Sequence, residues 1–346
     1  MPDYQMTTYG TTAGRNLVYA ATEMLEHVHT VSVLGQFGLQ KAQPGNRTDT
    51  IVWRRLNTFN MKANGTPSID PGGFRLQEGV NPPTYGHTYT DVSSTLKQYG
   101  YVEKFSDKAA QLYEDDIPGD ARTMTADVLA EIREMVIYGQ LKAGTQVEYS
   151  NGTTRAGINT SLSLNSVRRA VRSLQAARAN MITSKLSPGL AFASTPVKPS
   201  FLGFVHTDMI PNVRDLPHFK SVEEYASGRA VHESEIGNVE NVRFLASPLF
   251  EPYLAAGAAV GTTGMKSENA TNIDVYPVII TAANAWGQVA LKGMSSMTPV
   301  LIPAVPSAAT PLGMFGFVGA KMWMDAVRLN ENFMVRIETA VTNLAG

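Results

Sequence analysis

Apolar residues recur at three- and four-residue spacing along three stretches in the first half of the chain, which is the pattern of amphipathic helices. The pattern predicts helices over residues 15–34, 107–115 and 121–142, and the second of them should end before Pro118. The third is the longest, roughly 33 Å at 1.5 Å per residue, and Gly144 can end it. Its apolar stripe consists of Met124, Val128, Ile132, Met135, Val136 and Leu141.

A fourth helix is predicted to run to about Asn180, with Ser163 or Asn165 as its N-cap, because both residue types accept hydrogen bonds from a first turn. Its apolar face would consist of Leu164, Val167, Ala170, Val171 and Leu174, and its other face of Arg168, Arg169, Arg172 and Arg178. We expect the arginines to form a solvated face, and contact with acidic neighbours or with phosphates is the alternative.

Two stretches on either side of a long gap have the composition of strands. Residues 51–56 and 88–96 are rich in β-branched and aromatic residues. Glycine and proline crowd the stretch between them, at Gly65, Pro67, Pro71, Gly72, Gly73, Gly79, Pro82, Pro83 and Gly86. Loops beyond ~12–15 residues are uncommon in compact domains, and a lone two-stranded ribbon is marginal in water. We therefore predict a protruding hairpin that gains its order by lying on a neighbouring subunit; a flexible surface insertion is the alternative.

The rest of the chain alternates short strands with short helices. Strands are predicted over residues 201–206, 242–246, 275–281 and 287–291, and two further alternating stretches lie around 322–329 and 333–339. Thr207 or Asp208 can cap a short helix after the first of these strands. Strands and helices in this irregular order indicate a mixed α+β fold. The sequence contains no internal repeat.

The composition changes this picture in one respect, because charged residues are scarce. They make up 17% of the 346 residues, against about 25% in typical soluble domains. Interface cores are depleted of charge, so other subunits could cover much of the surface; a surface rich in Thr, Asn, Ser and Gln is the alternative. The net charge of −1 lacks the basic excess of a dedicated nucleic-acid binder.

Several classes of protein are excluded or disfavoured. The chain has no cysteine, which excludes disulfides, thiolate catalysis and cysteine-ligated metals. No apolar run approaches the ~20 residues that span a bilayer, and the polar stretch 1–14 lacks the order of a signal peptide. We therefore expect synthesis and action in a cytoplasm, with no membrane as partner.

The common catalytic and cofactor signatures are also missing, among them the phosphate loop, the dinucleotide fingerprint and the zinc-protease motif. The densest polar cluster consists of His206, Asp208, Arg214, Asp215 and His218. Its spacing fits no established ligand pattern, so we interpret it as turn and interface residues. We predict no catalytic residue, no metal and no cofactor, although a Ser-His-Asp arrangement that forms only in space would leave no mark in the sequence.

A series of segments carries a family resemblance when they are taken in order. They are residues 48–55, 76–80 with Pro82, 96–100, 141–145, 163–174, 206–216, 222–225, 236–243 and 311–313. Together they resemble the phage major capsid proteins of the N-four type, whose subunits are similar to the Hong Kong 97-type capsid fold. In that family 48–55 would be the ascending strand of the hairpin and 96–100 its returning strand. The stretch 57–75 departs from the family pattern, and no residue matches a motif for covalent cross-linking.

The resemblance implies four parts of the chain and a shell built from many copies. The parts are an N-terminal arm (1–45), an extended loop (46–106), a peripheral domain (107–159 and 291–346) and an axial domain (160–290). Hexamers and pentamers would close into the icosahedral head shell of a tailed phage around double-stranded DNA. Portal, scaffolding and decoration proteins are the further expected partners, and the packaged DNA would make weak, non-specific contact.

The same resemblance implies residues that contact neighbouring subunits. They are Trp53, Arg54, Arg55, Glu78, Tyr85, Tyr89, Tyr99, Arg214, Asp215 and His218. The expected function is structural and not enzymatic, and the expected location is the virion capsid, after assembly in the bacterial host cytoplasm. An encapsulin-like compartment, which has the same fold but encloses proteins, is the alternative function.

Overall fold

The computed structural model describes most of the chain that follows Val31. The described residues are 32–45, 48–57, 71–81, 84–112, 116–186, 194–225, 230–261, 263–291, 297–306 and 311–344. The helix predicted over 15–34 lies outside them except at its end, where Leu34–Gln36 (η1) forms a single 3-10 turn.

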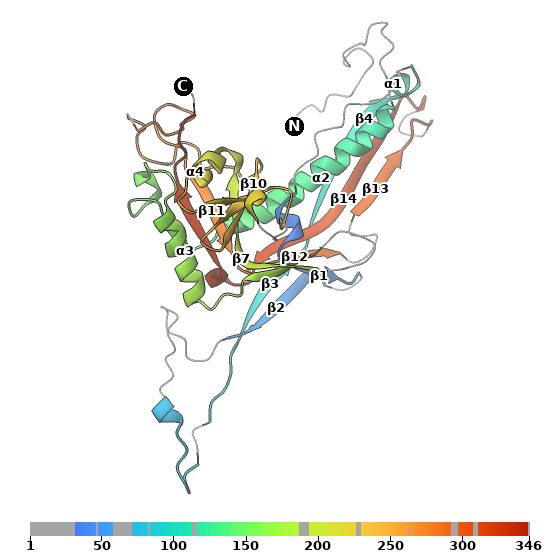
Figure 1. The fold of residues 1–346 in the computed structure, drawn as a ribbon. Coiled ribbons are helices and arrows are strands. Elements are labelled where there is room, and N and C mark those ends of the chain that lie inside the picture. Colours follow the sequence, from blue (N-terminus) through green and yellow to red (C-terminus); the bar gives the residue numbers. More distant parts are fainter. Residues whose placement is uncertain are drawn as a thin grey trace.

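A five-stranded sheet with one long helix along it forms one arm of the described molecule (Figure 1). Its order is β1, β12, β14, β13, and β4 also pairs with β14. The strands are β1 (Leu39–Gln43), β4 (Lys97–Ser106), β12 (Trp286–Leu291), β13 (Met297–Ile302) and β14 (Phe315–Arg328). The helix α2 (Ile117–Lys142) lies along β14 and β4, and its 26 residues make it about 39 Å long.

An eight-stranded sheet forms the other large part of the described residues, in the order β5, β15, β11, β7, β10, β9, β8, with β6 paired to β7. The strands are β5 (Val147–Tyr149), β6 (Ile182–Leu186), β7 (Ser194–His206), β8 (Lys220–Ser221), β9 (Glu235–Val239), β10 (Val242–Ser247), β11 (Tyr276–Thr281) and β15 (Met334–Thr339). The helix α3 (Leu164–Ala176) packs on β15 and β5. A short turn, Thr207–Met209 (η4), and α4 (Ile210–Arg214) follow β7.

The long helix α2 connects a large hydrophobic core to a small one near its N-terminal end. The large core includes Leu129, Ile137, Tyr138 and Leu141 of α2 together with Phe204, Phe250, Trp286 and Met334. The small one, here called the tip cluster, contains Phe105, Ile117, Ala121 and Val318. Because Phe204 belongs to β7 and Trp286 to β12, the large core also joins the two sheets; the two rings meet edge to face at 5.9 Å.

The strands β2 (Thr50–Leu56) and β3 (Tyr89–Thr95) form an antiparallel ribbon that protrudes from the body (Figure 1). Trp53 pairs with Val92 and Leu56 with Tyr89. The described residues of the loop beyond the ribbon include one 3-10 turn, Pro71–Phe74 (η2). The predicted hairpin is confirmed, since both strands form, pair with each other and extend away from the sheets.

Several other predicted elements are confirmed. Ser163 caps α3 by accepting a hydrogen bond of 3.2 Å from the Ser166 N–H, and the predicted apolar face of that helix packs in the core of the eight-stranded sheet. The four middle strands correspond to β7, β10, β11 and β12, and the two late stretches to β14 and β15. The short helix predicted over 107–115 is α1 (Asp107–Leu112), and residues 113–115 lie outside the described residues.

The helix α2 differs from its prediction at its start and along one face. The preceding helix does end before Pro118, as predicted, but α2 begins at Ile117 and not at residue 121. Pro118 occupies its first turn, where the missing N–H costs no hydrogen bond. Met124 and Met135 keep 39% and 43% of their surface exposed, so the predicted apolar stripe is wrong at both positions. The buried face changes along the helix as it passes from the tip cluster to the large core, and Leu129 and Ile137 are buried instead.

Residues 96–100 do not form the returning strand of the hairpin. β3 ends at Thr95, and β4 pairs along its whole length with β14, from Lys97 opposite Met324 to Ser106 opposite Phe315. Leu96, whose N–H donates to the Asp49 carbonyl at 2.9 Å, is where the chain passes from the ribbon into the five-stranded sheet. No glycine or proline separates β3 from β4, so the sequence carries no sign of this change of partner.

Candidate assembly surfaces

The base of the ribbon is fixed to the body by a small hydrophobic cluster. Ile51 and Trp53 are buried with Val289 of β12, and Trp53 keeps only 9% of its surface exposed. Ser94 of β3 donates a hydrogen bond of 2.5 Å to the buried carboxylate of Asp325. The ribbon therefore has a fixed base, and the ring of Trp53, a predicted contact residue, packs inside its own chain.

The opposite face of the ribbon is exposed and partly apolar. Val52, Leu56 and Tyr89 expose 51%, 59% and 53% of their surface. Beside them Arg54 donates two hydrogen bonds to Asp91, at 2.8 and 2.9 Å, and its guanidinium lies over the ring of Tyr89. The hydrogen bonds of this pair lower the pKa of Asp91 and raise that of Arg54. The face is thus apolar around one neutralised ion pair, which suits a protein partner.

The loop beyond the ribbon exposes a second group of apolar side chains, here called the loop surface. The rings of Phe74 and Tyr85, from the outgoing and the returning part of the loop, lie 5.2 Å apart. The surface consists of Phe74, Leu76, Val80 and Tyr85, which expose 41%, 75%, 61% and 55%. Glu78, like Tyr85 a predicted contact residue, lies exposed among them. Large apolar side chains gathered in this way mark an interaction site.

The end of the five-stranded sheet at which β13 and α1 lie (Figure 1) carries a third apolar group, here called the tip surface. Val102, Val300 and Ile302 lie on the face of the sheet away from α2, and Leu301 points to the other face of β13. The remaining members are Leu112, Val305, Leu312 and Met314. Leu301 and Ile302 are half exposed, and Leu312 exposes 80%. The loop surface and the tip surface lie at different extremities of the described chain, so each is available to another molecule.

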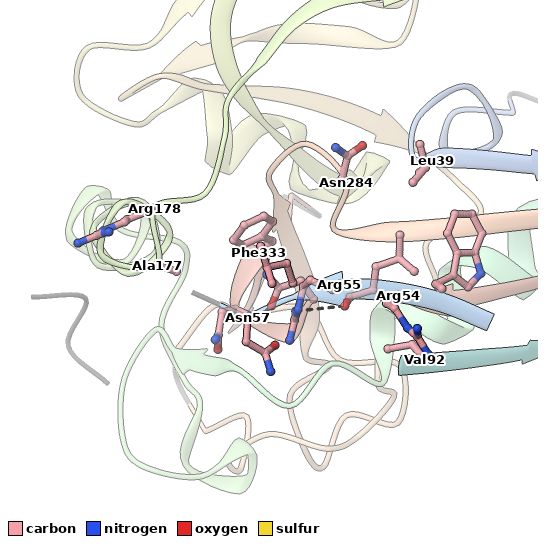
Figure 2. A pocket seen from close by; sticks show the side chains of 14 residues that line it. Leu39, Arg54, Arg55, Asn57, Val92, Ala177, Arg178, Asn284 and Phe333 are labelled. Atoms are coloured by element: carbon pink, nitrogen blue, oxygen red, sulfur yellow. Dashed lines mark hydrogen bonds between the residues drawn. The ribbon is translucent and has the colours of Figure 1, made fainter. Parts of the chain in front are cut away.

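A cavity of about 510 Å³ lies where the ribbon meets the body (Figure 2). It is lined by the ribbon, the two residues after α3, the turn before β12 and a last group, Leu329, Asn330, Asn332 and Phe333. Arg55 and Arg178 give it a positive wall, since Arg54, which also lines it, is paired with Asp91; none of the described residues that line it is acidic. Arg55 Nη1 donates to the carbonyl of Leu329 at 3.2 Å, the dashed line in Figure 2. Arg55 therefore ties the ribbon to the body.

His206 and Asp208, from the predicted polar cluster, lie at the end of β7 and the turn that follows it. Asp208 accepts hydrogen bonds from Lys266 Nζ at 2.5 Å and from the Tyr276 hydroxyl at 2.8 Å, and its Oδ2 lies 3.3 Å from His206 Nδ1. Burial lowers the pKa of His206. The contacts are those of a structural polar network that joins three segments of the chain.

The other members of that cluster do not join this network. Arg214, Asp215 and His218 are exposed at the end of α4 and just after it. The remaining predicted contact residue, Tyr99, is half-buried in β4 against the large core. In the described part of the chain, no three His, Asp or Glu residues are placed to hold a metal ion. No helix there has both the length and the apolarity needed to cross a membrane.

Arg168, Arg169 and Arg172 lie on the exposed face of α3, as predicted. The helix ends at Ala176 and not near Asn180, so Arg178 lies beyond it, with a φ of 55°. Arg168 pairs with Glu240 at 2.7 Å and Arg169 with Glu148 at 3.2 Å, and both guanidinium side chains remain about half exposed. Two of the positive charges are therefore matched by acidic groups of the same chain.

Sequence reasoning missed most of the exposed apolar residues. A signal existed in β2, where the consecutive apolar residues Ile51, Val52 and Trp53 must point to both faces of a strand. At the tip, residues 300–305 read Val-Leu-Ile-Pro-Ala-Val. Such a run is typical of a buried strand, and only the structure shows that nothing in the described chain covers it.

No protein-family model matches the sequence, and no curated protein matches it. Solved structures do match. The capsid of Ralstonia phage GP4 is similar over 99% of this chain and 100% of that chain, with a TM-score of 0.67 and 10% sequence identity. The head of Helicobacter pylori bacteriophage KHP40 is similar over 98% of both chains, with a TM-score of 0.60 and 9% identity.

A third similar structure is the capsid of a native GTA particle, with a TM-score of 0.57 and 11% identity over 97% of this chain and 99% of that chain. At such low identity the likeness shows the fold. The chain has the α+β fold of phage capsid chains over almost its whole length, and the predicted fold class is confirmed.

Proposed function

We propose that this chain, folded like the capsid chains of phage heads, is the major capsid subunit of a tailed phage and builds the icosahedral shell around its DNA. The observation that carries the proposal is the pair of apolar surfaces at different extremities, the loop surface and the tip surface. Two different surfaces that fit each other make heterologous contacts, and such contacts build rings and lattices. Many modest contacts made at once hold a shell together.

The contact we propose places the ribbon and the loop surface of one subunit over the tip surface of the next. Both surfaces expose large apolar side chains such as Leu76 and Leu301. The outer face of the ribbon, with Val52 and Leu56, would complete the covered area. Arg54, Arg55, Glu78, Tyr85 and Tyr89 would then lie at or near this contact, whereas Arg214, Asp215 and His218 would belong to another one.

The division into four parts is proposed with this function. Residues 1–45 would be the arm, 46–106 the extended loop, 107–159 with 291–346 the peripheral domain, and 160–290 the axial domain. The ribbon and β4 belong to the second part, α2 with β13 and β14 to the third, and most of the eight-stranded sheet to the fourth. The closer likeness to capsid proteins of the N-four type stays a prediction.

The role proposed is structural and needs no catalytic group, metal or cofactor. The virion is the proposed location, after assembly in the host cytoplasm, and portal, scaffolding and decoration proteins are proposed partners. The net charge of −1 suits a shell that holds DNA without binding it tightly. An encapsulin-like compartment would share the fold, but the similar structures described above are phage heads and a GTA particle.

Electron microscopy with light scattering tests the proposal. The chain, alone or with phage assembly proteins, should form closed shells or rings of five and six subunits. Deletion of residues 60–86 should leave a folded body that forms no shell. A chain that stays monomeric with every assembly partner would refute the shell function, and shells filled with protein in place of nuclease-resistant DNA would support the compartment.

Point variants test the contact itself. Leu76→Ser with Val80→Ser on the loop surface, and Val300→Ser with Ile302→Ser on the tip surface, should each abolish shells without unfolding the subunit, because all four side chains are exposed. Leu344→Ser, at a side chain with 70% exposure outside both surfaces, is the control and should assemble normally. Normal shells from both double variants would show that the two surfaces do not meet.

A further inference from the structure

A buried carboxylate of α2 holds the backbone at the point where the described chain begins. Glu134 is fully buried. Its carboxylate accepts hydrogen bonds from the successive N–H groups of Val33, Leu34 and Gly35, the first at 2.8 Å and the last at 3.2 Å. The Ser32 hydroxyl donates a fourth, at 3.1 Å. Successive N–H groups that converge on one anion form a nest, here filled by a side chain of the same molecule.

The carbonyl groups of the same corner are held as well. Gln288 of β12 donates to the carbonyls of Leu34 and Phe37, at 3.1 and 2.6 Å. Arg133 donates to the Gly35 carbonyl at 3.2 Å and to the Gln288 side chain at 3.0 Å. Arg133, Glu134 and Gln288, here called the corner socket, therefore hold both the donors and the acceptors of this short stretch of backbone.

The burial of the apolar side chains at this corner does not by itself require these hydrogen bonds. Val33 and Leu34 are already buried in the large core, and taking a carboxylate out of water is costly. Burial raises the pKa of Glu134, and the hydrogen bonds from the corner act against it. A buried polar group of this kind can fix one backbone geometry without adding to stability.

We propose that Glu134 is a positioning residue: the corner socket fixes the position and direction of the backbone at residues 32–37, and with it the place on the body from which the chain before Ser32 would reach a neighbouring subunit. The inference rests on the proposed shell function.

Hydrogen exchange measured by mass spectrometry on the unassembled full-length chain tests the anchor. Glu134→Gln keeps the size of the side chain but replaces one acceptor oxygen by an amide group that must face other N–H donors. Exchange at residues 33–35 should become at least tenfold faster. Glu131→Gln, which removes a charge from the exposed side of α2, is the matched control and should change nothing.

Shell formation tests the consequence. Glu134→Gln should lower the yield of closed shells at least fivefold against Glu131→Gln. Ser32→Ala removes one hydrogen-bond donor to Glu134 and leaves α2 untouched. It should lower the shell yield less than Glu134→Gln does, with an unchanged melting temperature. The positioning role can therefore be tested even if Glu134→Gln fails to fold. Faster exchange with normal shell yield would overturn the positioning role, and unchanged exchange would overturn the anchor.

The two proposals fail in different ways. If the unmodified chain forms no shell with any assembly partner, the shell function is wrong, and the exchange comparison still decides whether Glu134 holds the corner. If the unmodified chain forms shells and both Glu134→Gln and Ser32→Ala form them equally well, the shell function stands and the positioning role is wrong.

Discussion

At the scale of single residues, the ion pairs of the described chain differ sharply in burial. Glu338 of β15 has no exposed surface. Arg155 donates two hydrogen bonds of 2.7 Å to its carboxylate, and Arg336 donates a third at 2.9 Å. This triad joins β15 to the segment between β5 and α3. Exposed pairs such as Arg54–Asp91 are screened by solvent and contribute little to stability.

Glu338→Gln should lower the free energy of unfolding by about 3–5 kcal/mol, the usual cost of leaving a buried charge without its partner. Arg336, which is 7% exposed, would keep its charge and lose its carboxylate. Urea unfolding followed by circular dichroism measures the loss. Arg54→Gln, at the exposed pair, is the control and should leave the midpoint unchanged; an equal shift in both variants would contradict the distinction drawn here.

His206 should make stability depend on pH. Burial holds its pKa below the ordinary value of 6.5, with Lys266 acting in the same direction and Asp208 against it. The folded chain thus takes up the proton less readily than the unfolded chain. The stability present above pH 6.5 should therefore fall as the pH drops below that value.

Melting temperatures measured across this pH range check the expectation. His206→Asn keeps an acceptor for the Asp208 N–H, which now donates to His206 Nδ1 at 3.0 Å, and removes the titration. Its melting temperature should fall less steeply below pH 6.5. His218→Asn is the control, because His218 is exposed and its φ of 65° suits asparagine. An identical slope in the His206 variant would assign the pH dependence to other groups.

At the scale of elements, the ribbon is a rigid extension that grows from a fixed base. Trp53 and Ile51 bury one face of β2 against the five-stranded sheet, while Val52 and Leu56 leave the other face exposed. Asn57 closes the free end, since its N–H donates to the Thr88 carbonyl at 2.9 Å. The ribbon should therefore keep its position relative to the body as far as Asn57.

Trp53→Ala should release the base of the ribbon, because removing a buried aromatic ring costs about 3–5 kcal/mol. Hydrogen exchange should become faster at the amides of β2 and β3 while the rest of the chain keeps its protection. Val52→Ala, on the exposed face of the same strand, should leave exchange unaltered. Equal protection in the two variants would mean that the strands are held by their pairing and not by the ring.

The sequence predicted elements where local chemistry decided them. Ser163 marks the start of α3 because a cap and an apolar face agree there, and the composition around Trp53 marks β2. The prediction from sequence was wrong for β4, because the strand with which it pairs, β14, is distant in the chain. It was also wrong for Met124 and Met135, because their exposure depends on how α2 passes from the tip cluster to the large core. The corner socket could not be predicted either, since Glu134 meets Val33 and Gly35 only through the tertiary fold.

At the scale of the whole molecule, the chain combines few charges with apolar surfaces at separate extremities. The contacts proposed between copies therefore depend mainly on removing apolar area from water. Such contacts weaken on cooling and respond little to screening by salt. A shell held by ion pairs would behave in the opposite way.

Shell assembly should accordingly increase on warming from about 5 °C to about 25 °C, and should tolerate salt of the order of 0.5 M. Light scattering of the purified chain across both series measures this. Shells that dissolve with added salt at constant temperature would show that charged contacts dominate.

The helix α2 has a mechanical consequence. It is anchored over a broad area in the large core, but its N-terminal end rests on the few side chains of the tip cluster, Ile117 and Ala121 against Phe105 and Val318. A helix that is packed firmly at one end and weakly at the other should separate from its sheet first at the weakly packed end when force acts on the subunit. Pressure from a tightly packed genome should therefore open such a shell where the tip surface of one subunit meets the ribbon and loop surface of the next, and leave the body of each subunit intact.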